Sequence, residues 1–125
     1  MGGKAYDPQQ HAERIGVRVE YRRGLVHPGL WVPDHHTIYL RAGMTSIHER
    51  SVLAHELGHV CLGHRTSTPK HELQADRWAV RRLIDPDELR DVAAASPDPG
   101  VWCHALRVSA DLIDRWLADN RPRFA

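Results

Sequence analysis

One predicted helix, running from Ser46 to a stop at Gly63, sets the limits within which the rest of this chain must fold. The run Ser46-Ile47-His48-Glu49 has the form of a capping box, in which a serine at the helix start is followed three residues later by glutamate. A helix with this start needs other elements to cover its apolar side, because its apolar residues recur at helical spacing. They are Ile47, Leu53, Ala54, Leu57, Val60 and Cys61.

The same helix carries the run His55-Glu56-Leu57-Gly58-His59. Four residues along a helix correspond to about 400° of rotation and about 6 Å of rise, so His55 and His59 leave one face and converge on one point. Glu56 lies beside that face and reaches a metal-bound water without ligating the ion. The run therefore predicts a hydrolytic Zn²⁺ site, at which a metal-activated water attacks a carbonyl with Glu56 as general base and then acid. The alternative is a coincidence on an ordinary amphipathic helix.

A hydrolytic zinc site needs a third protein ligand and an open fourth position. The metzincin pattern places a third histidine six residues after His59, but that residue is Arg65. The next predicted helix offers Glu72 as the ligand. Asp76 follows one turn later on the same face, where we expect it to accept a hydrogen bond from the N–H of a ligating histidine.

His64 is the rival third ligand, because it follows His59 by five residues. It lies beyond Gly63, however, and a ligand after a helix stop is held less well because more backbone entropy must be lost to place it. We therefore expect that removing His64 changes zinc affinity little. Gln74 lies about 200° around its helix from Glu72, so we expect it in solvent. The remaining histidines before the last helices are expected on surfaces or turns: His11, His27, His35, His36, His48 and His71.

The rest of the chain predicts an α+β fold. A short helix from Gln9 to Ile15 is followed by a strand over 17–21, and strands over 30–32 and 37–40 form a hairpin around Pro33–His36. Further helices are predicted from Pro69 to about Ile84, from Asp85 onward, over 101–106 and over 110–118. We expect a small, mainly antiparallel three-stranded sheet flanking the zinc helix, with the other helices completing a single compact domain over residues 1–125. Residues 1–6 and 120–125 are expected to fray.

Composition excludes several classes of protein. Lys and Arg number 17 against 16 Asp and Glu, and a net charge of +1 leaves no electrostatic footprint for nucleic acid or for an anionic membrane. No run of 18 apolar residues is present to span a bilayer. The first residues contain no apolar signal segment, so we expect a cytoplasmic protein. Two cysteines, Cys61 and Cys103, do not make a disulfide scaffold.

Two segments of the sequence together resemble the ImmA/IrrE family of metallopeptidases. The first is Ala54-His55-Glu56-Leu57-Gly58-His59, and the second begins at Glu72 and continues Leu73-Gln74-Ala75-Asp76-Arg77-Trp78-Ala79. The likeness extends over about residues 8–117, although its specific motifs occupy 54–83. It implies that His55, His59 and Glu72 hold Zn²⁺ and that Glu56 is catalytic. Gln74 departs from the acid that is commoner in the family at this position.

The resemblance also implies a biological role and a type of partner. Such peptidases are often encoded by phages and mobile elements, and they cleave a helix-turn-helix transcriptional repressor or act with an antitoxin-like partner. In zinc peptidases of this build a strand beside the cleft holds the substrate, and we expect 37–40 to be that strand. Tyr39, His64 and His104 are the candidates for contacts to substrate or to the oxyanion.

Two other functions fit the same sequence less well. One is a zinc-containing regulatory binding protein without catalysis. The other is a DNA-binding module, because residues 105–117 have the spacing of a helix-turn-helix. The would-be recognition helix carries Asp111, Asp114 and Asp119 against Arg115 and Arg121, whereas a phosphate-facing helix should be basic. We therefore expect this segment to pack within the domain and direct nucleic-acid binding to be absent.

Overall fold

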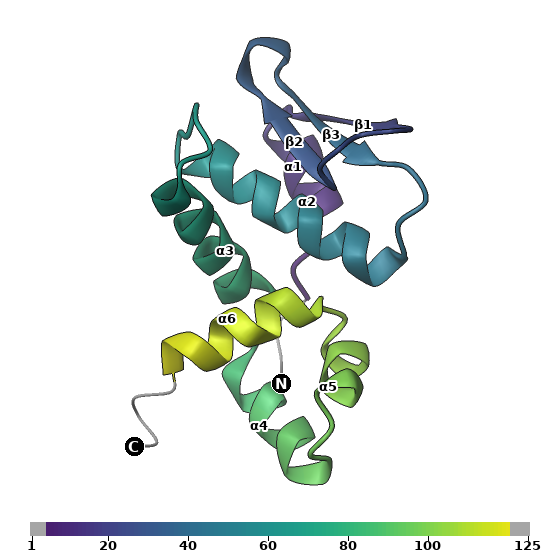
Figure 1. Ribbon diagram of the computed structural model, residues 1–125, viewed down its shortest axis with the longest axis vertical. Coiled ribbons are helices and arrows are strands. Elements are labelled where there is room, and N and C mark those ends of the chain that lie inside the picture. Colours follow the sequence, from purple (N-terminus) through teal and green to yellow (C-terminus); the bar gives the residue numbers. More distant parts are fainter. Residues whose placement is uncertain (1–4, 121–125) are drawn as a thin grey trace.

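The computed structural model describes residues 5–120 and confirms an α+β fold (Figure 1). Its strands are β1 (Arg18–Arg22), β2 (Gly29–Val32) and β3 (Thr37–Arg41), with a 3₁₀ turn at Pro33–His35 between the last two. Its helices are α1 (Pro8–Arg14), α2 (Ser46–Cys61), α3 (Pro69–Leu83), α4 (Pro86–Ala95), α5 (Pro99–Leu106) and α6 (Ala110–Asn120). Among the residues described, no helix combines the length and the apolar character needed to cross a bilayer.

The residue that caps helix α2 is Thr45, one position before the predicted Ser46. The hydroxyl of Thr45, not that of Ser46, accepts the hydrogen bond from the backbone N–H of His48 at 3.2 Å. Thr45 has an extended backbone (φ −63°, ψ 157°), which is the conformation of a residue at the helix boundary, and Ser46 is already helical. Threonine and serine both cap helices well, so local sequence does not distinguish the two.

The sheet is mixed rather than mainly antiparallel, with strand order β1-β3-β2. The tight turn before β3, where His36 has a φ of 51°, makes β2 and β3 an antiparallel hairpin. The loop that precedes β2 carries the chain past the centre of the sheet, so that β3 enters beside β1 and runs parallel to it. As a result β3 is paired on both sides, and β2 is an edge strand.

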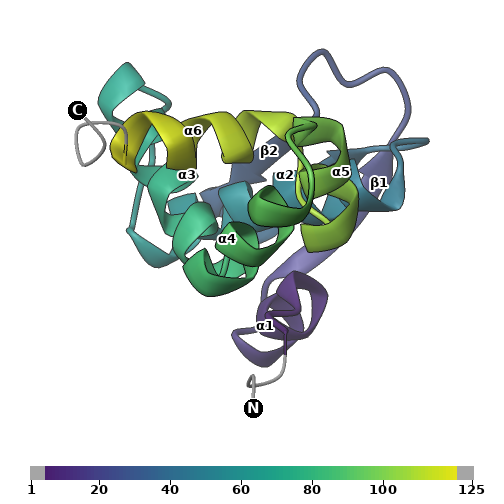
Figure 2. The same cartoon turned by 90° about the horizontal axis from the view of Figure 1, so that it is seen from below.

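Helix α2 lies between the sheet on one side and the helices α3 to α6 on the other (Figures 1 and 2), and it packs against a group of buried side chains on each side. On one side Leu53 and Leu57 pack with Ile38 and Leu40 of β3, and all four are fully buried. On the other side Ala54 joins a cluster built from α3, α4, α5 and α6. The helix is therefore fixed from both sides, and the part of it that carries His55 and His59 faces a cleft.

The N-terminal end of the described chain is packed, contrary to the fraying that we expected through residue 6. Tyr6 lies edge-on to Trp78 with ring centroids 6.1 Å apart, and its hydroxyl contacts Nδ1 of His11 at 2.6 Å. At the other end Asn120 still belongs to α6. The rest of the predicted frayed ends, residues 1–4 and 121–125, lies outside the described residues.

Gly58 lets α2 and α3 approach each other closely. In the sequence it is unexpected, because glycine inside a helix costs about 1 kcal/mol relative to alanine. A Cβ at this position would lie 3.0 Å from the carbonyl oxygen of Ala75 and 3.1 Å from its Cα. The close contact holds the helix that bears the histidines against the helix that bears Glu72.

We expect Gly58→Ala to lower the stability of the fold. The neighbours of the added methyl group are backbone atoms of α3, which have no rotamer to escape into, and overpacking costs about 1–3 kcal/mol. The gain of about 1 kcal/mol in helix propensity offsets only part of this cost. Urea unfolding of both proteins in the presence of a chelator measures the difference without a contribution from bound metal. If the alanine variant is more stable than the wild type, α2 and α3 can move apart at little cost, and the close contact at Gly58 is not required for stability.

Candidate metal centre

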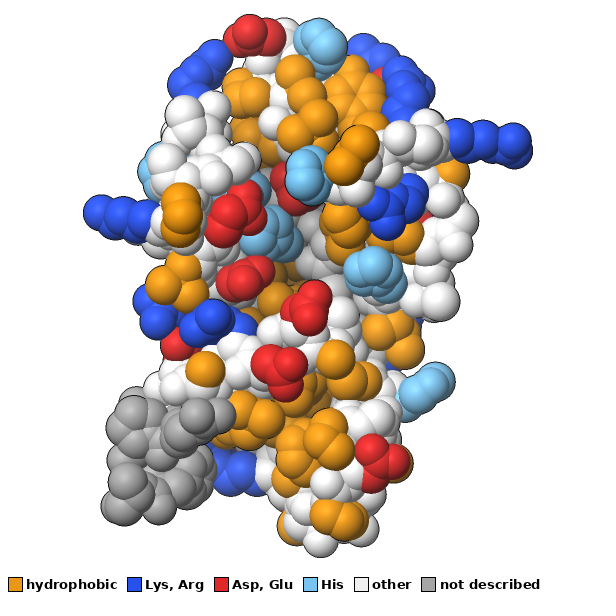
Figure 3. Space-filling model, in the orientation of Figure 1, with side chains coloured by type: hydrophobic (Ala, Val, Ile, Leu, Met, Phe, Trp, Pro, Cys, Tyr) orange, Lys and Arg blue, Asp and Glu red, His pale blue; other side chains and the backbone are white. Residues whose placement is uncertain are grey.

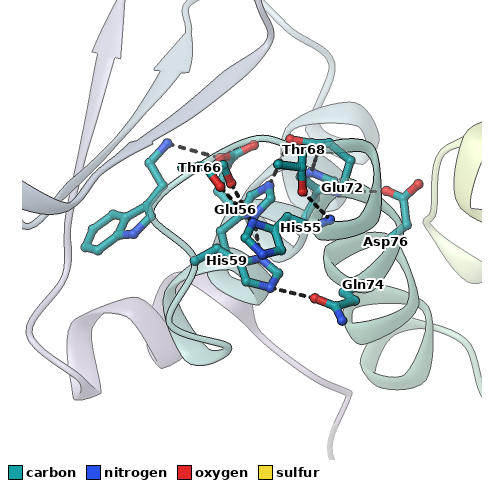
Figure 4. A network of polar contacts seen from close by, with 11 residues as sticks. His55, Glu56, His59, Thr66, Thr68, Glu72, Gln74 and Asp76 are labelled. Carbon is teal, nitrogen blue, oxygen red and sulfur yellow. Dashed lines mark hydrogen bonds and ion pairs between the residues drawn. The ribbon is translucent and has the colours of Figure 1, made fainter.

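The structure brings His55, His59 and Glu72 together on facing sides of α2 and α3 (Figure 4). One ligand atom from each residue lies within 4.8 Å of the others. Nε2 of His55 is 2.7 Å from one carboxylate oxygen of Glu72, and Nε2 of His59 is 3.2 Å from the other oxygen. Within residues 5–120 this is the one group of three such side chains with this geometry.

The donor set fits a divalent metal ion of the zinc type. Two imidazole nitrogens and one carboxylate oxygen make up the three protein ligands of one class of catalytic zinc site. The side chain of His59 is 6% exposed, that of His55 is 17% exposed, and that of Glu72 is 43% exposed. The ligands are therefore anchored in the protein on the α2 side and open to solvent on the α3 side.

Asp76 holds His55 from behind. Its Oδ1 lies 2.7 Å from Nδ1 of His55, so a proton on Nδ1 is donated to the carboxylate and the lone pair of Nε2 is left for the ion. Burial lowers the pKa of His55, but the hydrogen bond to Asp76 and the charges of Glu56, Asp76 and Glu72 outweigh burial and raise this pKa to about 9. Burial and the nearby charge of His55 instead lower the pKa of His59 to about 4.

Glu56 points into the same site but is not one of the three clustered ligands. Its Oε1 accepts a hydrogen bond from the backbone N–H of Trp31 in β2 at 3.0 Å. Burial raises the pKa of Glu56 to about 7, and the charge of His55 and the Trp31 hydrogen bond only partly oppose this effect. A carboxyl with such a pKa exchanges protons readily near neutral pH.

His55, Glu56, His59 and Glu72 line a cleft of about 580 Å³ (Figure 3). Edge strand β2 lines it on one side, and the start of α6 lines it on another. Gly29 at the start of β2 is close to α2, because a Cβ there would lie 2.6 Å from Cγ1 of Val52 and 3.0 Å from Cγ of Glu56. Further lining residues are Leu30, Trp31, His48, Ser51, Asp76 and Asp111.

The structure does not bring Tyr39 or His104 to this cleft. The hydroxyl of Tyr39 contacts Nδ1 of His35 at 2.8 Å, and neither Tyr39 nor the exposed His104 on α5 lines the cleft. Strand 37–40 was expected to hold the substrate, and this is wrong, because β3 is paired on both sides and the edge strand at the cleft is β2.

Several residues at the cleft were not expected there. His27 and His48 line it, although the sequence placed them on surfaces or turns. Gln74 is exposed, as expected, but its Oε1 contacts Nε2 of His64 at 2.8 Å. The contact of Trp31 with Glu56 joins residues 25 positions apart through a backbone N–H, which no side-chain pattern reveals. His48 had a usable signal, because it precedes His55 by seven residues and therefore shares its helix face.

Comparison with known families agrees with this geometry. The sequence matches the IrrE N-terminal-like domain, a family of metallopeptidases, over residues 12–117. A comparison with curated proteins gives no match. The matched range contains both helices of the metal centre, the whole sheet and most of α6. The chain therefore belongs to the IrrE N-terminal-like family of metallopeptidases.

Proposed function

We propose that this protein is a zinc-dependent endopeptidase whose ion is held by His55, His59 and Glu72. The observation that supports this most strongly is the convergence of the three ligand atoms within 4.8 Å, with the carboxylate of Glu56 beside them. Bound zinc supplies Lewis acidity, which lowers the pKa of a water molecule and polarises the carbonyl of the substrate. Glu56 is the general base, and it later returns the proton as a general acid.

The hydrogen bond from Trp31 distinguishes the two carboxylate oxygens of Glu56. Oε1 is occupied by the N–H of Trp31, which fixes the plane of the carboxylate. Oε2 remains to accept the proton of the attacking water and to donate it to the amine that leaves. Because the side chain is largely buried, little solvent competes for that proton.

We propose that the substrate binds along strand β2. This strand lies at one edge of the sheet, lines the cleft with Gly29, Leu30 and Trp31, and contacts the base directly. An extended peptide binds to such an edge through its main chain on both sides of the bond to be cut. This mode of binding suits cleavage within a chain and is the reason for proposing an endopeptidase.

The substrate that we propose is a helix-turn-helix transcriptional repressor or an antitoxin-like protein, cut to relieve repression. The resemblance of the motifs in 54–83 to the ImmA/IrrE family supports this class of substrate. A phage or mobile-element origin follows from the same resemblance and remains a prediction, as does the cytoplasmic location expected from the sequence. The test is to incubate the zinc-loaded protein with the repressor encoded by the adjacent gene and to identify the fragments by mass spectrometry.

The controls of this experiment separate the alternatives. Cleavage that stops on adding a chelator and is absent from Glu56→Gln supports the proposal. Stable binding of the repressor without cleavage would instead favour a zinc-containing regulatory protein.

The packing of α5 and α6 argues against the DNA-binding alternative. Val108 between them is fully buried, and Leu112 and Ile113 belong to the same core. Asp119 pairs with Arg77 at 2.9 Å and with Arg115 at 3.5 Å, so the helix surface is not a free basic face. Arg121 lies outside the described residues. We expect no salt-dependent gel shift with random duplex DNA.

Zinc binding is expected to release about one proton per ion at pH 7.5. The pKa of His55 is raised to about 9, so this ring carries a proton at pH 7.5 that the metal must displace. Zinc affinity therefore rises with pH until the pH passes about 9, and acid strips the metal. His59, with a pKa of about 4, is already neutral and adds no proton. Calorimetric titrations in buffers of different ionisation enthalpy measure the number released. Zinc binding without proton release would contradict ligation through His55.

A further inference from the structure

His59, like His55, has a hydrogen-bond partner behind it, but this partner is another histidine. Nδ1 of His59 lies 2.9 Å from Nδ1 of His64, and Nε2 of His64 lies 2.8 Å from Oε1 of Gln74. His59 is 5% exposed and His64 is 7% exposed. The dashed line at Gln74 in Figure 4 marks the contact of Gln74 with His64, the last of these hydrogen bonds.

The hydrogen-bonded series His59–His64–Gln74 determines which ring nitrogens of the two histidines carry a proton. An amide oxygen only accepts, so Nε2 of His64 donates to Gln74, and a neutral His64 then has a lone pair on Nδ1. That lone pair accepts the proton of His59 Nδ1, which leaves Nε2 of His59 free on the side of Glu72. We propose that His64 and Gln74 are positioning residues, which hold His59 in the tautomer and ring orientation required for a metal ligand. The proposal rests on the metal site proposed above.

The end of α2 is built to place His64 at this position. Gly63 ends the helix with a φ of 73°, a conformation that favours glycine, and the chain turns back on itself. The backbone N–H of His64 then donates to the carbonyl oxygen of His59 at 2.9 Å. The ring of His71 stacks on that of His64 with centroids 4.0 Å apart and planes 10° apart. His64 is therefore held by its backbone, by a stacked ring and by Gln74.

Helix α3 thus serves both metal-binding histidines. Glu72 contacts the Nε2 atoms of His55 and His59, Asp76 accepts from His55, and Gln74 accepts from His64 behind His59. The two supports differ in charge, because His55 is backed by a carboxylate and His59 by a neutral chain that ends in an amide. This arrangement revises the expectation that His64 is dispensable for zinc affinity.

The test compares two replacements of His64 that differ in hydrogen bonding and in size. The side-chain oxygen of asparagine occupies nearly the position of Nδ1 in histidine and accepts the same proton, whereas phenylalanine fills the space of the ring without accepting. We expect His64→Phe to weaken zinc binding about 10–100-fold, the usual loss for an outer-shell partner, and His64→Asn to recover most of the affinity. Competition with a chromogenic chelator measures both. If packing alone mattered, phenylalanine would preserve affinity better than asparagine.

Gln74 gives a second test on an exposed residue, where folding is not at risk. We expect Gln74→Leu to weaken zinc binding severalfold, and Gln74→Glu to bind at least as tightly as the wild type, because a carboxylate accepts more strongly. His35→Asn is the matched control, since His35 contacts Tyr39 and does not line the cleft, and it should bind zinc like the wild type.

The possible outcomes distinguish this inference from the proposed function. A wild-type protein that does not bind zinc overturns both. A wild type that binds zinc, together with a His64→Phe variant at least as tight as His64→Asn, or a Gln74→Leu variant of wild-type affinity, overturns the positioning role alone. The order wild type, His64→Asn, His64→Phe from tightest to weakest supports it.

Discussion

Replacing Glu56 by glutamine is expected to leave zinc bound and to abolish nearly all peptide hydrolysis. Glu56 is not among the three clustered ligand side chains, and its amide counterpart still accepts the Trp31 N–H through its oxygen. What the variant lacks is a group that takes a proton from water and returns it to the amine. General acid–base catalysis of this kind is worth about 10²–10⁴-fold in rate.

Two measurements on the same sample check this expectation. Metal analysis after dialysis should give the same zinc content for Glu56→Gln as for the wild type, and single-turnover cleavage of the proposed repressor substrate should be slower by that factor. Loss of zinc from the variant would show that Glu56 is a ligand. Full activity with zinc retained would show that another group is the base.

Replacing Glu72 by alanine is expected to lower zinc affinity by orders of magnitude and to abolish proteolysis. Glu72 contacts both histidines and is the one carboxylate among the three ligands. With a divalent ion bound, the Glu72 carboxylate would lower the formal charge of the site from +2 to +1 and would attract the ion through its own negative charge. Without it, two neutral imidazoles remain.

Asp76→Ala provides the graded comparison for this prediction. Asp76 contacts only the far nitrogen of His55, so its loss should weaken zinc binding about 10–100-fold, less than the loss of Glu72. Titration of both variants against a competing chelator gives the order. If Asp76→Ala or His64→Phe binds zinc more weakly than Glu72→Ala, then Glu72 is not the third ligand.

The positions that depend on helix periodicity were predictable from the sequence. The spacing of His55 and His59 brings both rings to one face, and the spacing of Glu72 and Asp76 brings two carboxylates to the facing helix; the structure places all four together. Such predictions work because helical geometry is rigid over one or two turns. They identify which residues meet, whereas the chemical role of each remains to be measured.

The contacts that depend on loops and on strand order were not predictable. A hairpin pattern indicates that β2 and β3 pair, but it carries no information about which of them lies at the sheet edge. Gly63 signals a helix end, yet the direction in which the chain leaves determines whether His64 reaches His59. For this reason the sequence did not reveal the contact of Gln74 with His64, and it favoured the strand over 37–40 for the substrate.

The hydrogen bond between Trp31 and Glu56 sets the alignment of any peptide bound along β2. Residues 29 and 31 direct their backbone groups away from β3, because successive residues of a strand alternate between its two sides and the Trp31 N–H faces Glu56. The Glu56 carboxylate therefore takes one of the hydrogen-bonding positions that a bound strand would use, and the Trp31 carbonyl and the two backbone groups of Gly29 would remain for the peptide. A peptide displaced by one residue along β2 would turn each of its side chains to the opposite face of the sheet. The position of Glu56 beside Trp31 would therefore help to determine which peptide bond reaches the site.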